Sequence, residues 1–471
     1  MPLAIGNKFY CFDQGYHSAI HCSAFSELKI NNFADYTTDD GSWIKRKLFH
    51  EHLGFVQGEN FKIIADPLFE FTYSRDVERN ENMYENTRGL MLYAELYKKI
   101  TLISSYYENQ ASMPGYIDDY YNVFRVIPGE ARVKPYRNDA YDWGTAYASL
   151  SYKPTRFLYV ETGNDKNFIG DGYRSLILSD YAPQYLYFKT VLSAKNFFYM
   201  NLATRTLNPN YNNINGDTPD WSENSLYPHK FVNINYLGYN PTLFLQLGVF
   251  EATAFGTNAQ FSKKITAFFP GLNEALYHTN DTLHFIWGGN FLFSPVSNVG
   301  IYGQFAYGQK QAAAYQAGCK VTIVNTRWMR FIFGRIEWNY VGAGMYQPLG
   351  NENYWGHYNQ VLAHPAGNDF SEIIVQAAVS RIRFKVSLTG GMIYYRTGLG
   401  ARGIFSANIN DAMEPDRVVF SQARIAYVVN YAYHWQFFAS ATYYSRKNSG
   451  EHYIMPSVGI KTCLRNQYHD F

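Results

Sequence analysis

The amino-acid sequence predicts an all-β protein, a single transmembrane antiparallel β-barrel of about 18 strands with a short, partly helical N-terminal periplasmic segment. Three observations predict this fold. Aromatic residues make up 18% of the 471 residues and charged residues only 17%, against roughly 25% charged residues in soluble domains. Apolar residues recur with period two over long runs, which is a strand pattern. The connections between these runs alternate between short and long, as in outer-membrane barrels.

Composition excludes several other classes of protein. The mean hydropathy of the chain is slightly polar and 47% of its residues are apolar, so a bundle of membrane-spanning helices is excluded. A stretch without formal charge, between Asp281 and Lys310, is interrupted at Gly288 and Pro295, and its apolar residues alternate as in two strands and a turn. The net charge of +2 provides no electrostatic basis for binding nucleic acid.

The strand pattern is clear in two stretches. In residues 381–389, apolar side chains at even positions alternate with basic or hydroxyl side chains at odd positions. In residues 332–340, the row at even positions alternates with Phe333, Arg335, Glu337 and Asn339. A soluble β-sandwich would also alternate, but its strands average about 5 to 6 residues. The runs here have roughly 9 to 14 residues, enough to cross a bilayer at a tilt. The rows opposite the apolar ones predict lumen-lining side chains at Arg335, Glu337, Arg381, Arg383 and Lys385.

Counting these runs in chain order predicts about 18 strands, an even number, as single-chain bacterial barrels require. Tyr, Trp and Phe near the ends of many runs suit the aromatic girdles at the two membrane interfaces. The predicted strands are residues 61–73, 88–97, 100–108, 141–152, 155–163, 184–194, 196–206, 230–239, 242–254, 282–294, 297–307, 312–324, 328–341, 372–380, 382–396, 418–429, 434–445 and 455–469.

The connections divide into two sets. Tight turns are predicted at Lys98-Lys99, Lys153-Pro154, Lys195, Asn240-Pro241, Pro295-Val296, Asn325-Thr326, Arg381 and 430–433. The intervening connections are mostly long, as at 108–140, 207–229, 254–281 and 342–371, and 308–311 is the short exception. This parity predicts a bacterial outer-membrane protein with both termini periplasmic and the long loops extracellular. A soluble propeller is disfavoured because no repeat of blade length occurs.

The two ends of the chain differ from the barrel pattern. Residues 1–59 are predicted as an N-terminal periplasmic or plug segment and residues 60–471 as the barrel, with a helix starting at 39–42 and running through Trp43 to Leu53. This segment either caps the barrel mouth or docks a periplasmic partner. The last strand resembles the aromatic-ended final strand of outer-membrane proteins. Phe471, however, is out of register with its apolar row, which predicts an appended tail at 469–471.

Cysteine usage and the N-terminus leave two questions open. Cys11, Cys22, Cys319 and Cys463 are too scattered for a zinc site or a disulfide framework. Either Cys11 and Cys22 form a bridge or all four thiols are free. The first eight residues lack the basic start and apolar run of a secretory signal. A transmembrane barrel then implies that a signal peptide was removed before this numbering begins.

The most distinctive segment runs from Gly163 to Asp180. Gly170 and Gly172 flank Asp171, which predicts a tight turn that uses positive φ. The strand, glycine loop and helix of a phosphate loop are missing, and the acidic spacing does not fit an EF-hand. A structural role, in which the tight turn fixes the conformation of this loop, is favoured over a ligand-binding role. If the loop binds a ligand, the candidate residues are Asn164, Asp165, Lys166, Asp171, Tyr173, Arg174 and Asp180.

Residues 163–166, the 170–172 turn and the Ser-Leu-Ile-Leu-Ser-Asp run at 175–180 resemble the signature of the Wzi-like capsule-assembly family. They also resemble related surface barrels of Bacteroidota linked to gliding motility. In the capsule proteins this stretch carries Gly-Arg-Gln-Lys and a Gly-Pro-Gly turn, so the sequence departs at Asn164, Asp165 and Asp171 and is more similar to the Bacteroidota branch. Residues 17–20 resemble that branch as well. The resemblance implies an 18-stranded barrel whose loops close the outer mouth and whose surface holds capsular polysaccharide.

Sugar recognition requires planar aromatic rings against the CH face of the sugar and polar side chains for its hydroxyl groups. The predicted long loops contain both. Candidate glycan-contacting residues are Trp221, Asn353, Tyr354, Trp355 and His357. The alternative is that these side chains fold their own loops or form the upper aromatic girdle.

Three functions compete. The first is non-enzymatic assembly or attachment of a surface polysaccharide, with outer-membrane lipid and the polysaccharide as partners. The second is an accessory barrel of a multiprotein envelope machine for gliding motility, secretion or outer-membrane protein or lipoprotein assembly. The third is a diffusion porin, because barrels of 16 to 18 strands can enclose a channel. The sequence has no local motif that combines a nucleophile with a His and a carboxylate, so no enzyme is predicted. His50-Glu51-His52 is interpreted as helix surface, and no metal or cofactor is predicted.

Overall fold

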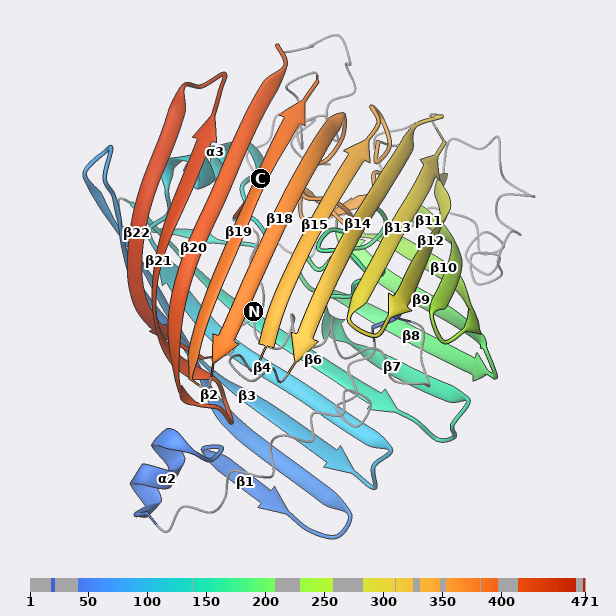
Figure 1. Ribbon diagram of the computed structural model, residues 1–471, viewed down its shortest axis with the longest axis horizontal. Helices are drawn as coiled ribbons and strands as arrows, with labels where there is room; N and C mark the ends of the chain where they lie inside the picture. The colour runs from blue at the N-terminus through green and yellow to red at the C-terminus, as the bar shows by residue number, and fades with distance from the viewer. Residues whose placement is uncertain are drawn as a thin grey trace.

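The computed structural model describes residues 18–21, 41–137, 139–207, 229–256, 283–309, 311–324, 331–347, 353–381, 383–396, 414–462 and 469–470. Within these residues the chain forms a closed antiparallel β-barrel of 18 long strands (Figure 1). Each wall strand pairs with its neighbours in chain order, and the barrel closes where the first wall strand pairs with the last, from Glu70↔Lys461 to Ser74↔Ser457. The predicted fold class is therefore confirmed.

The wall strands run in sequence order around the barrel. They are β2 (Phe61–Asp76), β3 (Glu81–Leu96), β4 (Ile100–Ala111), β6 (Ala140–Tyr152), β7 (Leu158–Asp165), β8 (Tyr185–Ala194), β9 (Phe197–Leu207), β10 (His229–Thr242), β11 (Leu245–Gly256), β12 (Leu283–Val296), β13 (Val299–Gly308), β14 (Ala313–Val324), β15 (Phe331–Val341), β18 (Phe370–Arg381), β19 (Phe384–Tyr395), β20 (Asp416–Asn430), β21 (Trp435–Arg446) and β22 (Glu451–Lys461).

Six smaller elements lie outside the wall. A short strand β1 pairs with the start of β2, β5 pairs with β6, and β16 pairs with β17 as a hairpin of its own. Of the helices in the described ranges, neither is long and apolar enough to span a membrane. The smaller elements are β1 (Gly54–Gln57), β5 (Lys134–Tyr136), β16 (Gly356–His357), β17 (Gln360–Val361), α2 (Trp43–Phe49) and α3 (Gly115–Phe124).

Each predicted strand corresponds to one observed wall strand, and two boundaries differ most. β3 begins at Glu81 rather than at residue 88. Residues 81–87 have a polar composition without clear alternation, but they pair with β2 up to Asp76↔Glu81, so backbone hydrogen bonding extends the strand where side-chain pattern does not. β22 ends at Lys461, whereas the prediction ran to residue 469. Residues 463–468 lie outside the described part of the chain.

The outward row of the wall is apolar and exposed. On β19, Phe384, Val386 and Leu388 are 45 to 56% exposed, while Lys385 on the opposite row is partly buried. Other strands carry exposed outward side chains such as Val249 and Ile336. A continuous apolar surface of this extent is unfavourable in water and suits lipid hydrocarbon. The pattern supports the transmembrane assignment from the surface itself.

The connections follow the predicted alternation. At one end of the barrel the described turns are short, as at 97–99, 195–196 and 243–244. At the other end, long connections run over 112–139, 166–184 and 342–369. Three connections at this second end are short: 77–80, 309–312 and 447–450. The first and last of these exceptions join β2 to β3 and β21 to β22, next to the strand pair that closes the barrel.

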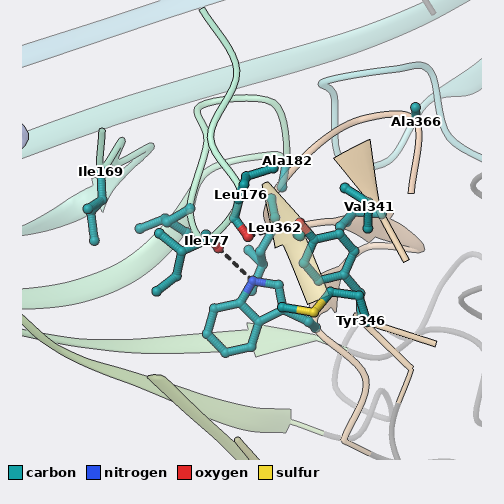
Figure 2. Packing of buried hydrophobic residues seen from close by; sticks show 14 of the residues in the cluster. Ile169, Leu176, Ile177, Ala182, Val341, Tyr346, Leu362 and Ala366 are labelled. Atoms are coloured by element: carbon teal, nitrogen blue, oxygen red, sulfur yellow. Dashed lines mark hydrogen bonds between the residues drawn. The ribbon is translucent and has the colours of Figure 1, made fainter. Parts of the chain in front are cut away.

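The hydrophobic core lies inside the barrel. Two long connections fold inward and pack against each other and against the wall (Figure 2). The first contributes Ile169, Leu176 and Ile177, and the second contributes Tyr346 and Leu362. Interior side chains therefore pack on folded loops, and the site is built from these loops.

Candidate functional site in the barrel interior

The connection from β7 to β8, residues 166–184, turns into the barrel and is called the inner loop here. Every residue from 167 to 179 is buried. Its Leu176-Ile177-Leu178 run belongs to the interior hydrophobic cluster. Ile169 forms isolated β-bridges with Leu178 and with Ile20. The loop therefore closes on itself, and a piece of the N-terminal segment lies beside it.

The two glycines of the inner loop meet different requirements. Gly170 has φ of +137°, a backbone conformation that side chains disfavour. This agrees with the turn predicted from the sequence. Gly172 instead allows close approach, because a Cβ atom there would lie 2.6 Å from Oε2 of Glu337 and 2.8 Å from Nε2 of Gln316. The tip of the loop therefore fits tightly against the wall.

Inward side chains of the wall satisfy the backbone of the inner loop. The carboxylate of Glu337 on β15 accepts hydrogen bonds from the N–H groups of Tyr173 at 2.6 Å and Arg174 at 3.0 Å. It also accepts one from the hydroxyl of Tyr302 at 2.7 Å. Gln316 donates to the carbonyl of Arg174, at 3.0 Å. Because buried backbone groups need partners, these wall residues determine where the loop can lie.

A buried ion network holds the same tip. It consists of Arg174, Glu372, Asp470 and His364. Nη2 of Arg174 lies 3.1 Å from a carboxylate oxygen of Glu372 and 3.1 Å from one of Asp470. Nε2 of His364 lies 2.6 Å from the other oxygen of Glu372. The hydroxyl of Tyr173 donates to Asp470 at 2.9 Å. Two carboxylates around one guanidinium provide the pairing that buried charges require.

The ionisation of the loop groups in this network follows from their surroundings. Burial alone would lower the pKa of Arg174, but the Asp470 and Glu372 carboxylates raise that pKa well above its usual value. Burial lowers the pKa of His364, although Glu372 opposes this shift. Nδ1 of His364 accepts a hydrogen bond from the N–H of Ala366. The neutral ring therefore carries its proton on Nε2, and this N–H donates a hydrogen bond to Glu372.

A second loop, which joins β15 to β18, covers the inner loop with its described residues 342–347 and 353–369. The Tyr346 hydroxyl donates to the carbonyl of Leu176 at 2.9 Å, and the Trp355 indole N–H donates to the carbonyl of Ile177 at 2.7 Å, the dashed bond in Figure 2. The N–H of Ser179 donates to the carbonyl of Leu362. These contacts join two loops that are far apart in sequence into one packed unit.

The predicted glycan-contacting residues lie within this packed unit. Asn353, Tyr354, Trp355 and His357 are all at most 7% exposed. Nδ1 of His357 accepts a hydrogen bond from the N–H of Leu207 at 2.9 Å, and its Nε2 lies 3.1 Å from the carbonyl oxygen of Gln184. Trp355 and His357 thus contact the inner loop, and His357 also contacts the wall. Their contact with a sugar stays a prediction, and Trp221 lies outside the described residues.

The predicted loop-signature residues separate into two groups. Asp171, Tyr173 and Arg174 converge at the tip, where Nζ of Lys320 lies 3.6 Å from Asp171. The other group lies at the base of the loop. Asn164 donates to the carbonyl of Ala146, Asp165 accepts from the N–H of Lys166, Lys166 donates to the carbonyl of Gly129, and Asp180 is only partly buried.

Four of the five predicted lumen-lining residues lie on inward rows or at the rim, and one does not. Arg335 and Glu337 are buried in the interior, and Lys385 is partly buried. Arg383 donates to the carbonyl of Val428 at the short-turn rim. Arg381 is exposed and pairs with Phe384. A two-residue turn separates them, so both side chains lie on the outward face, whereas the sequence prediction assumed a turn at Arg381 itself.

Next to the tip of the inner loop lies a polar cavity of about 210 Å³. Inward side chains of β2, β3 and β19 to β22 form its wall, and Tyr116 of α3, Tyr173, His469 and Asp470 cover it. Lys461 and Glu70 form an ion pair across the closure of the barrel, with 3.2 Å between Nζ and Oε1. The cavity therefore lies where the first and last wall strands meet.

Two basic side chains of this cavity lie close to the same aromatic ring. The guanidinium carbon of Arg424 lies 4.8 Å from the centroid of Phe438, and Nζ of Lys461 lies 5.3 Å from it. Within the described residues, Nε of Arg424 and Nε2 of His469 are buried without a hydrogen-bond partner. The carboxylate-bearing Glu85, the amide of Gln422 and the hydroxyls of Ser440 and Thr442 also line the space. Sequence reasoning missed these residues, although Gln422 and Arg424 lie two apart on a predicted strand.

The remaining predictions concern cysteine and metal. Cys319 on β14 is a free, partly buried thiol. Cys11, Cys22 and Cys463 lie outside the described residues, so the alternatives for a disulfide stay open. In the part of the chain that the structure describes, no group of three or more His, Cys, Asp or Glu side chains could hold a metal ion.

No protein-family model matches the sequence, and no curated protein matches it. Solved structures do match. The chain is similar to Wzi, an outer-membrane protein involved in group 1 capsule assembly in Escherichia coli and described as a carbohydrate-binding β-barrel, with a TM-score of 0.55, 13% identity and coverage of 85% of each chain. Two porins give lower scores. OprD of Pseudomonas aeruginosa has a TM-score of 0.43 and 8% identity over 88% of this chain and 97% of its own. A BenF-like porin from Pseudomonas fluorescens Pf-5 has a TM-score of 0.46 and 7% identity over 87% of this chain and 100% of its own. At such identities the likeness concerns the fold, and this chain has the fold of an outer-membrane β-barrel similar to that of Wzi.

Proposed function

We propose that this protein is a non-enzymatic outer-membrane β-barrel that takes part in the assembly or attachment of a surface polysaccharide. The observation that carries the proposal is the cavity of about 210 Å³ beside the tip of the inner loop. Its lining combines aromatic rings with carboxylate, guanidinium, amide and hydroxyl groups. The similarity to Wzi, itself described as carbohydrate-binding, supports the same direction.

The chemistry of the cavity suits a sugar unit. The Phe438 and Tyr116 rings line the cavity and supply aromatic surface for the CH groups of a pyranose. Carboxylate and guanidinium groups each bind two neighbouring hydroxyls, and Glu85 and Arg424 supply one of each. The volume leaves room for far more than one water molecule. Mostly pre-formed clefts with a few directed polar groups are typical of small-ligand sites.

A diffusion porin is the competing function, and the packed interior disfavours it. The inner loop occupies part of the interior, and a pore through the space that it fills would displace it. That displacement would expose the buried charge of Arg174 and leave Glu337 without its backbone donors. Breaking a buried ion pair costs about 3–5 kcal/mol.

Two other expectations stay predictions. One is a role in gliding motility or in another envelope machine, and the other is membership of a Bacteroidota branch.

Deleting the gene from the source bacterium tests the proposal. We expect the amount of cell-bound polysaccharide to fall several-fold and the released amount to rise. Complementation with Arg424→Met or Phe438→Ala should restore retention poorly. Arg417→Met is the matched control, because Arg417 is an exposed residue of the same strand. Normal retention in the deletion strain would contradict the function.

Two further outcomes separate the site from the function. If deletion abolishes retention but both cavity variants restore it fully, the polysaccharide binds elsewhere on the barrel. Purified protein in planar bilayers should show no steady conductance. An open-channel current that persists in the unmodified protein would favour the porin.

A further inference from the structure

We propose that residues 43–57, which hold α2 and β1, rest in the headgroup region of the lipid leaflet at the short-turn rim of the barrel. This segment is called the foot. It lies beyond the end of the wall formed by β20 to β22 (Figure 1). The proposal does not depend on the polysaccharide function, because it concerns a surface that the interior site does not use.

The foot exposes an unusual amount of apolar surface for its size. Trp43 and Ile44 are 61% and 62% exposed, and Val56 is 57% exposed. Leu48 and Leu53 are also exposed, at 40% and 46%. Each large apolar side chain that leaves water gains about 1.5–3 kcal/mol. A cluster of this kind on a short segment therefore marks a surface that is covered in the functional state.

The foot is attached to the rim in a defined orientation. Nδ2 of Asn430 donates to the carbonyl oxygens of Lys47 and Glu51, at 3.0 Å each. Nδ1 of His52 lies 2.5 Å from Oδ2 of Asp66 on β2. β1 pairs with β2 from Gly54↔Ala65 to Gln57↔Lys62. The exposed apolar side chains are thus held by the barrel and do not belong to a loose tail.

The apolar surface of the foot continues the lipid-facing belt. The Phe49 ring lies 6.4 Å from the ring of Trp435, which lies 5.9 Å from Phe437 and 6.4 Å from Phe69. Phe437 is outward-facing and 50% exposed. Val56 pairs with Ile63, which is also exposed. Continuity with a surface that already contacts hydrocarbon favours lipid over a water-soluble partner as the occupant.

The charges of the foot fit an anionic lipid surface. Three consecutive bases, Lys45, Arg46 and Lys47, follow the exposed Trp43 and Ile44. Glu51 is the one acidic residue between 43 and 57, and it lies 3.2 Å from Arg46 and 3.1 Å from Lys47. The segment keeps a net positive charge. Tryptophan together with basic residues is typical of segments that lie in a membrane interface.

Spin labelling tests the foot directly. Ile44→Cys and Leu48→Cys are introduced separately into protein whose four native cysteines are replaced by Ser, labelled with a nitroxide and placed in phosphatidylethanolamine–phosphatidylglycerol vesicles. We expect several-fold less collision with a water-soluble nickel chelate, and more with oxygen, than for a label at Glu59→Cys. Glu59 is the matched control because it is an exposed polar residue of the adjoining turn.

Two results would overturn the proposal. Labels at residues 44 and 48 that are as accessible to nickel as the label at residue 59 would exclude lipid contact. Labels that become shielded only in native membranes, and not in vesicles of the pure protein, would indicate a protein partner instead. A Trp43→Glu/Leu53→Glu variant that keeps the unfolding midpoint of the parent but exposes the label at residue 44 would support the proposal and show that a folding defect is not the cause.

Discussion

Glu337 shows how one wall residue can position a loop. The carboxylate is fully buried and accepts hydrogen bonds from two consecutive backbone N–H groups, those of Tyr173 and Arg174. It accepts another from the Tyr302 hydroxyl. A carboxylate lining an open channel would be solvated by water. Here the charge is satisfied by donors from the inner loop, so this residue holds the inner loop against the wall.

His357 provides a pH-dependent contact between loop and wall. Burial is the main cause that lowers its pKa to about 3, from an ordinary value of 6.5. A pKa lowered in the folded state means that folding favours the neutral ring. The resulting stability is fully present above pH 6.5 and is lost as the pH falls through the interval toward 3. Protonation of Nδ1 would also break its hydrogen bond from the N–H of Leu207.

We therefore expect the urea midpoint of unfolding to fall between pH 7 and pH 4.5, and to fall less steeply in His357→Asn. His364 and His469 also have lowered pKa values, so part of the slope should remain. His452→Gln is the control, because His452 is exposed and its replacement should leave the slope unchanged. An identical slope in His357→Asn and in the parent would contradict this assignment.

At the scale of elements, the inner loop depends on close contact with β15. A Cβ atom at Gly172 would approach Glu337, the Arg174 carbonyl and Gln316 to within 2.6–2.8 Å. Gly172→Ala should therefore displace the tip of the loop and destabilise the protein by about 1–3 kcal/mol. The displaced tip should also permit measurable conductance in planar bilayers.

Gly334→Ala is the matched control for this substitution. Gly334 lies on the same strand as Glu337, and a Cβ atom there would meet nothing within 4 Å. The control should keep the stability and the conductance of the parent. If both glycine variants behave alike, the tight fit of the tip against β15 does not determine either property.

At the scale of the whole molecule, closure of the barrel depends on one of the two shortest strand pairings in the described wall. β2 pairs with β22 over five residue pairs, from Glu70↔Lys461 to Ser74↔Ser457, as few as β6 with β7, whereas β2 pairs with β3 over sixteen. Side chains reinforce the closure, because Oγ of Ser74 lies 2.8 Å from Oγ of Ser457 and Lys461 pairs with Glu70. We expect opening to begin at a short pairing such as this one, since fewer hydrogen bonds hold the two strands together.

A disulfide across the closure tests this expectation. Ser74→Cys/Ser457→Cys, oxidised, should stabilise the barrel by about 2–4 kcal/mol relative to its reduced form, because it closes most of the chain into one loop. The matched pair is Ala423→Cys/Ala441→Cys, which joins paired residues of β20 and β21 within a continuous ladder. We expect a smaller gain there, measured as the shift in urea midpoint on oxidation. An equal or larger gain for the control would show that closure is not a weak point.

The strands of the wall can be predicted from the sequence better than the contacts of the interior. Every wall strand was predicted, because lipid outside and packed loops inside impose opposite demands on alternate residues. Residues 81–87 of β3 escaped prediction, since their extension depends on pairing with β2 rather than on pattern. Arg381 was placed on the wrong row, because a shift of one residue in the turn reverses the face.

The sequence by itself determined the class of fold, the strand order and the inner loop as the distinctive segment, because each depends on local periodicity and local glycine chemistry. Only the tertiary structure decided what the inner loop touches. Arg174 meets Glu372 and Asp470 across 198 and 296 residues of sequence, and Tyr173 meets Glu337 across 164. The cavity beside them likewise requires β2 to meet β22. Such contacts arise from closure of the barrel, which brings together residues whose local sequences carry no information about each other.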